Sequence, residues 1–271
     1  MFVSLEPAAR LMLPEVREIQ LVLVGVGGTG SHLAGSLGSI LVHARSKGVN
    51  ISLTLFDPDI VEEKNIGRQQ FCYAELGQNK AMSMAWRLNA AFGLEIVAVP
   101  EAFTVERFSQ FRQSYGASTL LIGAVDNYLG RQALARVCKQ GAGRIWWLDA
   151  GNDYAHGQVL VGNGRYAHID PLGLASDLPA PDVQEPLLLE EDKHYTQLSC
   201  AERVMREEQS LLVNRMTASI AASYVQEFVF ERTLSAFATH FQLHPASMRS
   251  LLLTQSNLAQ WLEPPTPIAA P

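Results

Sequence analysis

The sequence predicts an α/β fold with a Rossmann-like, doubly wound and mostly parallel sheet. Three observations support this fold class. Short apolar runs alternate with helix-like runs up to residue 149, the first apolar run ends in a glycine-rich turn, and Asp57 follows the second run. Alternating strands and helices are typical of parallel sheets with helices on both faces.

The predicted elements follow one another along the chain. Residues 19–24, Ile-Gln-Leu-Val-Leu-Val, are apolar except for Gln20, as in a strand that is buried on both faces. Residues 30–46 have apolar side chains at three- and four-residue spacing, which predicts the crossover helix of a βαβ unit. Further strands are expected at 51–56, 94–99, 119–123 and 144–149, and further helices at 78–92, 104–114 and 128–140.

The composition changes at residue 170. Residues 170–200 contain four prolines and seven acidic residues, against Lys193 as the one Lys or Arg. Because proline ends helices and is excluded from central strands, this stretch predicts a long, mobile crossover loop over the surface.

The last part of the chain has a helical pattern. We expect one or two long helices up to Phe241 and another from His244 to Trp261. These C-terminal helices, within residues 201–263, would complete the α/β domain formed by residues 1–169. Residues 264–271 are proline-rich and predict a flexible tail.

Composition and charge exclude several classes of protein. The chain has 271 residues, of which 48% are hydrophobic and 18% charged, so it can bury a core without disulfides and is not predicted to be disordered. Its 27 acidic residues against 21 basic residues argue against nucleic acid as the main partner. No apolar run approaches the roughly 18 residues that span a bilayer, so no membrane anchor is expected.

The cysteines favour a reducing compartment. Cys72, Cys138 and Cys200 are odd in number and widely spaced, and therefore predict neither a disulfide framework nor a structural zinc site. A cytoplasmic location fits this pattern.

The glycine-rich turn predicts a nucleotide site. Residues 25–30, Gly-Val-Gly-Gly-Thr-Gly, match Gly-x-Gly-x-x-Gly between a predicted strand and a predicted helix. Such glycines allow a phosphate to approach backbone N–H groups at a helix N-terminus, and Asp57 could accept ribose hydroxyls. A tight turn without a ligand is the alternative. The lysine-containing P-loop pattern is absent, which argues against a P-loop ATPase.

Four further motifs indicate whether the nucleotide is a dinucleotide or ATP. They are Asp57-Pro-Asp59, Asn65-Ile-Gly-Arg68-Gln69, Gly77-Gln-Asn-Lys80 and Asp126-Asn127-Tyr-Leu-Gly-Arg131. In this order and spacing, they resemble the signature of the ThiF/MoeB/HesA superfamily, whose members are similar to the ubiquitin-activating enzyme. The resemblance covers roughly residues 19–152, and the chain looks most like the ThiF-family members of the PRTRC gene cassettes.

The resemblance implies an activity and its cofactors. Such enzymes use ATP and Mg²⁺ to transfer AMP to the C-terminal carboxylate of a small ubiquitin-like or sulfur-carrier protein of the β-grasp type, and pyrophosphate is released. The carboxylate itself attacks the α-phosphate, so catalysis depends on positioning and on cations that offset developing charge.

The resemblance also implies the site residues. Asp57 would hold the ribose, Asn65, Arg68 and Lys80 the phosphates, and Asp126 the Mg²⁺ ion, with Arg68, Lys80 and Asp126 as catalytic residues. The implied nucleotide-binding set is Gly25, Gly27, Gly28, Gly30, Asp57, Asp59, Asn65, Arg68, Gln69, Lys80, Asp126 and Asn127.

Several of these residues have a simpler structural interpretation. Arg68 and Lys80 could be surface charges, and Asp59 could support a turn. Asp126 could cap the helix that follows it.

Cys200 is a further candidate. In thioester-forming members of the superfamily, a cysteine at the end of the crossover loop receives the activated carboxylate. Cys200 lies where the acidic stretch ends, and a helix beginning there would lower its thiol pKa. The alternative is a small buried side chain, as for many cysteines.

The sequence also departs from the superfamily pattern. Paired Cys-x-x-Cys motifs are absent, so no structural zinc is expected, and His240 and His244 are interpreted as a chance pair. Many relatives form homodimers in which an N-terminal arginine reaches the partner's ATP site. In this sequence Arg10 or Arg17 could have that role, so a homodimer is an open expectation.

Two other functions compete with adenylylation. An NAD-dependent Rossmann oxidoreductase would explain the glycine turn and Asp57, but not Arg68, Lys80 or Asp126. A non-catalytic docking module could keep the nucleotide site and bind only a partner.

Overall fold

The computed structural model describes residues 10–11, 18–111, 117–141, 143–169, 174–191 and 211–262. Its main sheet has eight strands in the order β11-β10-β7-β6-β5-β2-β3-β4. The strands are β2 (Ile19–Val24), β3 (Ile51–Phe56), β4 (Val97–Val99), β5 (Ser118–Gly123), β6 (Ile145–Asn152), β7 (His156–Gly162), β10 (Ala236–Leu243) and β11 (Ala246–Leu252).

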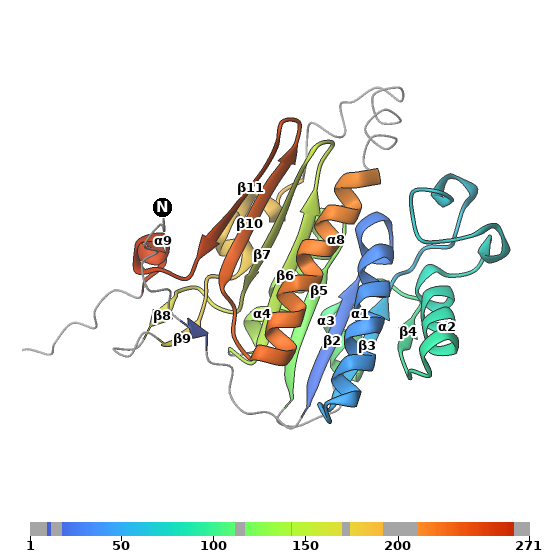
Figure 1. Cartoon of the computed structure of the whole chain (residues 1–271), viewed down its shortest axis with the longest axis horizontal. Helices are drawn as coiled ribbons and strands as arrows, with labels where there is room; N and C mark the ends of the chain where they lie inside the picture. Colours follow the sequence, from blue (N-terminus) through green and yellow to red (C-terminus); the bar gives the residue numbers. More distant parts are fainter. Residues whose placement is uncertain are drawn as a thin grey trace, which may run out of the picture.

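Helices cover both faces of this sheet. Figure 1 shows α1 (Gly28–Ser46) and α8 (Leu211–Gln226) side by side on one face, with α2 (Lys80–Phe92) toward the β4 edge. The other face is covered by α3 (Val105–Phe111) and α4 (Tyr128–Gln140). Two separate groups of buried apolar residues fill the two interfaces, which confirms the doubly wound α/β fold class.

The parallel half of the sheet agrees with the sequence prediction. Strands β4, β3, β2, β5 and β6 run parallel, and β5 is buried at every position. The chain steps from β2 to β3 on one side and reaches β5 on the other. The carboxyl end of β2 is therefore a topological switch point, where ligands bind in open α/β sheets.

The C-terminal half of the sheet corrects the prediction. Strands β7, β10 and β11 pair antiparallel, and neither β7 nor the hairpin was expected. The helix predicted from His244 to Trp261 is wrong, because β11 occupies much of it, followed by the short α9 (Gln255–Leu258) and η5 (Ala259–Trp261). His240 lies in β10, so the pair with His244 shares no helix face.

Pairing explains why β10 is a strand. Phe237, Thr239 and Phe241 alternate along it and are all buried, and β7 and β11 supply the backbone partners on either side. A π-helical turn (Glu227–Glu231) ends the long helix α8 before this strand begins. Tertiary pairing thus overrides the helical composition of the segment.

The described part of the acidic stretch, residues 174–191, is ordered, contrary to the expectation of a long mobile loop. β9 (Leu174–Asp177) joins β1 (Arg10–Leu11) and β8 (His168–Ile169) in a small sheet, and α5 (Pro181–Gln184) and η3 (Pro186–Leu189) follow. Asp182 is buried and forms an ion pair with Lys139 of α4, at 2.6 Å between Nζ and Oδ2. This stretch therefore packs against α4.

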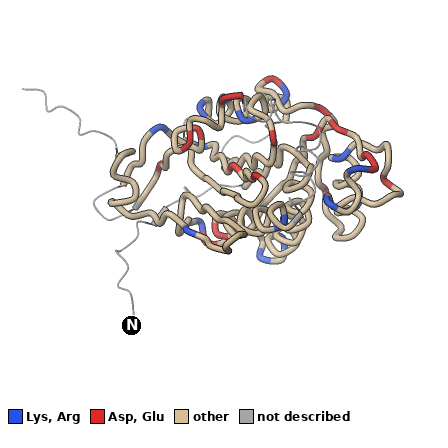
Figure 2. The backbone as a smooth tube through the Cα atoms, turned by 90° about the horizontal axis from the view of Figure 1, so that it is seen from above, with Lys and Arg blue, Asp and Glu red and all other residues tan. Residues whose placement is uncertain are grey.

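Two further observations concern the charges and the helices of the described residues. Figure 2 shows Lys and Arg interspersed with Asp and Glu along the backbone. Within the described ranges, no helix has both the length and the apolar character needed to cross a membrane. The expected tail at 264–271 and Cys200 lie outside the described residues.

Candidate functional site

The glycine turn lies at the carboxyl end of β2 and leads into α1. Gly25 has a positive φ of 89°, and a Cβ on Gly30 would lie 1.9 Å from the Gly25 carbonyl oxygen, so both positions require glycine. Gly27 is the N-cap of α1, and no side chain of the described residues caps this helix. The first N–H groups of α1 therefore remain available to an anion such as a phosphate.

Asp57 fastens this turn to the next strand. Its carboxylate is 5% exposed and accepts hydrogen bonds from the Val26 N–H at 2.6 Å and from the Asp59 N–H at 2.9 Å. Burial raises the pKa of this carboxyl above its ordinary value, although the two hydrogen bonds act in the opposite direction. Asp57 thus has a structural task, which the sequence did not indicate, in addition to its predicted contact with ribose.

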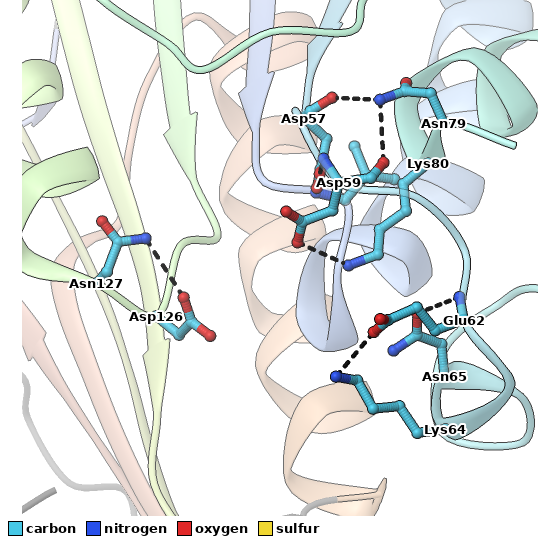
Figure 3. Close-up of polar contacts among 10 residues, drawn as sticks. Asp57, Asp59, Glu62, Lys64, Asn65, Asn79, Lys80, Asp126 and Asn127 are labelled. Atoms are coloured by element: carbon cyan, nitrogen blue, oxygen red, sulfur yellow. Dashed lines mark hydrogen bonds and ion pairs between the residues drawn. The ribbon is translucent and has the colours of Figure 1, made fainter. Parts of the chain in front are cut away.

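Lys80 is held beside Asp59 at the start of α2. The side-chain amide of Asn79 donates to the carbonyl oxygens of Asp57 and Asp59, at 2.8 and 3.0 Å, and the Lys80 ammonium lies 3.0 Å from the Asp59 carboxylate (Figure 3). The Lys80 side chain is only 8% exposed, whereas that of Asp59 is 65% exposed. Lys80 is therefore not the surface charge of the simpler interpretation.

The segment that carries Asn65 and Gln69 lies beside the glycine turn. Asn65 is buried, and its side-chain oxygen accepts from the Glu62 N–H at 2.9 Å. The Gln69 amide nitrogen lies 3.9 Å from the place that a Cβ on Gly27 would take. The Gln69 side-chain oxygen is buried and has no hydrogen-bond partner among the described residues. A buried polar oxygen of this kind usually has a hydrogen-bond partner, which a ligand or a water molecule can supply.

Arg68 belongs to the same segment. It is half-buried, and its Nε donates to the Lys64 carbonyl oxygen at 3.2 Å. A guanidinium carries five N–H donors, a number that suits the contact with phosphate that the motif predicts.

A buried carboxylate supports the same segment from behind. Glu75 accepts hydrogen bonds from Ser83 and Arg87, both on α2, and Arg87 also donates to the carbonyl oxygen of Gln70. These partners hold the pKa of Glu75 below its ordinary value, although burial acts the other way. The segment from Asp57 to Lys80 is therefore fixed by α2.

Asp126 approaches from the opposite side of the glycine turn. It follows β5, whereas Asp57 follows β3, and β2 lies between these two strands (Figure 3). Asn127 is the cap of α4, because its side-chain oxygen accepts from the Gly130 N–H at 2.8 Å. The capping interpretation of Asp126 is therefore wrong. Asp126 itself is exposed, and its Oδ1 accepts a long hydrogen bond of 3.4 Å from the Asn127 side-chain amide, so the carboxylate is accessible to a ligand.

The described residues hold no ready-made metal cage. Among the residues that the structure describes, no group of three or more His, Cys, Asp or Glu side chains could hold a metal ion. Asp126 is a lone carboxylate, which suits Mg²⁺ only if phosphates complete the coordination, as they commonly do.

Two interactions near the site were missed by sequence reasoning. Arg131, the last residue of the fourth motif, forms an ion pair with Asp149, which is fully buried at the end of the predicted strand 144–149. Asn214 of α8 lies against Gly28 and accepts hydrogen bonds from Thr29 and Asn152. The motif position of Arg131 was a usable signal, whereas nothing in the sequence pattern marks Asn214.

The geometry therefore places the predicted phosphate-binding residues on one side of the glycine turn and the Asp126 carboxylate on the other. A family comparison agrees with it: the model of the ThiF family matches residues 5–250. The chain belongs to the ThiF family. Among curated protein sequences, none matches this chain.

Several solved structures have a similar fold. The ThiF-family chain is similar to PaaA, with a TM-score of 0.58, 16% identity and 88% of the chain covered. It is also similar to E. coli MccB, with a TM-score of 0.59 and 14% identity over 86% of the chain. A further MccB structure, solved with AMPCPP and MccA, gives a TM-score of 0.59 and 15% identity over 86% of the chain. The chain spans 65% of the length of PaaA and 62% and 63% of the length of the two MccB chains.

Proposed function

We propose that this ThiF-family chain adenylylates the C-terminal carboxylate of a small protein or peptide, using ATP and Mg²⁺, in the cytoplasm. The supporting observation is the arrangement around the glycine turn. An uncapped helix N-terminus is flanked by the nearly buried Lys80 on one side and the exposed Asp126 on the other. A triphosphate would meet donors and a cation on one side and a magnesium-binding carboxylate on the other.

The residues have separate tasks in this proposal. The N–H groups at the start of α1 and the side chains of Asn65, Arg68 and Lys80 bind the phosphates. Asp57 already accepts two backbone N–H groups, and a carboxylate has lone pairs left for ribose hydroxyls. Gln69 has an unpaired buried oxygen beside the turn. Asp59 keeps the Lys80 ammonium in place.

The chemistry needs no nucleophilic side chain. The acceptor carboxylate attacks the α-phosphate, the bond to the pyrophosphate leaving group breaks, and an acyl adenylate is formed. Mg²⁺, held by Asp126, would offset charge on the phosphates. Arg68 and Lys80 add positive charge where it develops, and the site gains rate mainly by orienting the two reactants.

The acceptor is proposed from the family resemblance and from one neighbour. Members that resemble this chain activate small ubiquitin-like or sulfur-carrier proteins, and MccB has been solved with MccA. We propose a small β-grasp protein with an extended C-terminal tail. Transfer of the activated carboxylate to Cys200 and assembly as a homodimer are further parts of this proposal.

ATP–pyrophosphate exchange tests the function. Purified chain is mixed with candidate small proteins encoded beside its gene, with the Asp126→Ala variant alongside. Exchange should require an acceptor and vanish in Asp126→Ala, whereas Glu106→Gln on the exposed face of α3 serves as the matched control and should retain it. ATP binding without exchange for any acceptor would favour the docking module, and tighter binding of NAD than of ATP would favour the oxidoreductase.

A further inference from the structure

A groove of about 610 Å³ lies on the antiparallel half of the sheet. It runs between the carboxyl end of β6, the start of β7 and the β10–β11 hairpin. Figure 1 shows the β6–β7 turn and the β10–β11 turn at the same end of the sheet as the start of α1. Its lining is mixed: Gly151, Gly157, Leu188, Phe241 and Met248 are small or apolar, and the other lining residues are polar or charged, among them Arg131, Arg249 and Asp153.

Arg131 is the residue that α4 contributes to this groove. It lies in the first turn of the helix that Asn127 caps, and its N–H bonds to the Asn127 carbonyl oxygen. Arg131 therefore connects the groove to the loop that carries Asp126.

A buried carboxylate fixes the Arg131 side chain. Its Nε donates to Asp149 Oδ1 at 3.2 Å, and the Asp149 side chain is 1% exposed. Asp149 Oδ2 is buried and has no hydrogen-bond partner among the described residues. Burying a charge with one hydrogen bond is costly, so this pair is poor as a device for stability alone.

Among the described residues, the Arg131 side chain donates its hydrogen bond through Nε, so Nη1 and Nη2 remain available to a ligand. Nη2 lies 3.1 Å from the place that a Cβ on Gly151 would take, so the glycine leaves room for the guanidinium over β6. A guanidinium with free terminal donors matches carboxylate or carbonyl oxygens.

We infer that Arg131 binds the oxygens of the acceptor's C-terminal peptide in this groove, and that Asp149 is the positioning residue that orients it. This inference rests on the proposed function, because it concerns the substrate of that same site. The ligand class is an extended peptide with a free carboxylate, bound through main-chain and terminal oxygens. With a volume of about 610 Å³, the groove has room for such a segment beside the cation.

The test measures binding and needs no turnover. Full-length chain with ¹⁵N-labelled arginine is titrated with N-acetyl-tetraglycine, which has a free carboxylate, or with its C-terminal amide, in the presence of AMPCPP and Mg²⁺. The Arg131 Nε–H signal is assigned from Arg131→Lys. Arg249 also lines the groove, so its signal is an internal reference.

The free-carboxylate peptide should shift the Arg131 signal. Its affinity should fall about 10- to 100-fold in Arg131→Met, since a charge-assisted hydrogen bond is lost. It should fall similarly in Asp149→Asn, while the affinity for AMPCPP stays unchanged in both. Arg136→Met, an exposed position on the same helix, should bind the peptide like the wild type.

Three results would overturn the inference. They are an Arg131 signal that the peptide does not move, peptide affinity that Arg131→Met leaves unchanged, and equal losses of AMPCPP and peptide binding. Wild-type-like peptide affinity in a folded Asp149→Asn variant would refute the positioning role. Failure of the proposed function has a different signature, namely wild-type chain that does not bind ATP in calorimetry.

Discussion

In one lysine–aspartate pair of this chain the lysine is buried, and in another the aspartate is buried. This difference predicts that substituting the first lysine affects ligand binding and that substituting the second affects stability. In the first, Lys80 is 8% exposed and Asp59 is 65% exposed. In the second, Lys139 is 62% exposed and Asp182 is 5% exposed. We compare Lys80→Met with Lys139→Met.

Lys80→Met should change ligand binding more than stability. The carboxylate it leaves behind is exposed to water, and methionine fills the buried space, so the free energy of unfolding should change by less than about 1 kcal/mol. The lost charge-assisted contact to phosphate corresponds to about 1.5–3 kcal/mol, which weakens ATP binding roughly 10- to 100-fold.

Lys139→Met should have the opposite effect. It leaves the buried Asp182 carboxylate without its ion-pair partner, and an unsatisfied buried group costs about 1–3 kcal/mol. Lys139 lies in the last turn of α4, at the opposite end of that helix from Asn127 and the neighbouring Asp126, so ATP affinity should stay at the wild-type value.

Calorimetric titration with ATP and Mg²⁺ measures the first quantity, and urea denaturation measures the second. Wild-type ATP affinity in Lys80→Met would refute the phosphate role of Lys80. Reduced ATP affinity in Lys139→Met without a loss of stability would refute the assignment of that pair to packing.

Three further predictions address the glycine turn, the cysteines and pH. In urea denaturation, Gly30→Ala should lower the free energy of unfolding several times more than Gly35→Ala. The alanine Cβ at position 30 would meet the Gly25 carbonyl oxygen, whereas a Cβ at position 35 would have no atom within 4 Å. Equal effects would contradict the close approach at Gly30. Burial raises the pKa of the Cys138 thiol to about 12, so at pH 8 a thiol reagent should label the exposed Cys72 in native chain and Cys138 only after unfolding, as peptide mass analysis can show. Burial raises the pKa of Asp57 in the folded chain, so the contribution of Asp57 to stability should fall as pH rises from the ordinary carboxyl pKa to the raised one. The difference in unfolding free energy between wild type and Asp57→Asn should follow that trend. A pH-independent difference would contradict it.

The sequence determined the parallel half of the fold. Runs such as residues 19–24 are apolar on both faces, and this pattern has few alternatives to a buried parallel strand. The antiparallel half was not readable in this way. In β11, residues 246–250 are exposed, so their pattern carries no burial signal, and pairing with β10 decides their conformation.

The motif spacing likewise predicted a candidate site through the family resemblance. It grouped the glycine turn, Asn65, Lys80 and Asp126 as one set, and Asp57 and Asp126 follow β3 and β5, whose carboxyl ends lie at one edge of the sheet on either side of β2. It did not indicate the structural tasks that such residues also have.

Only the tertiary structure decided those tasks, because they depend on burial and on contacts between distant segments. Asp57 fastens the glycine turn through Val26, and Asn127 rather than Asp126 caps α4. Arg131 meets its carboxylate on β6, 18 positions along the chain. A sequence records the types of side chain and their order, whereas the free energy of each charge depends on the solvent and partners that the fold supplies.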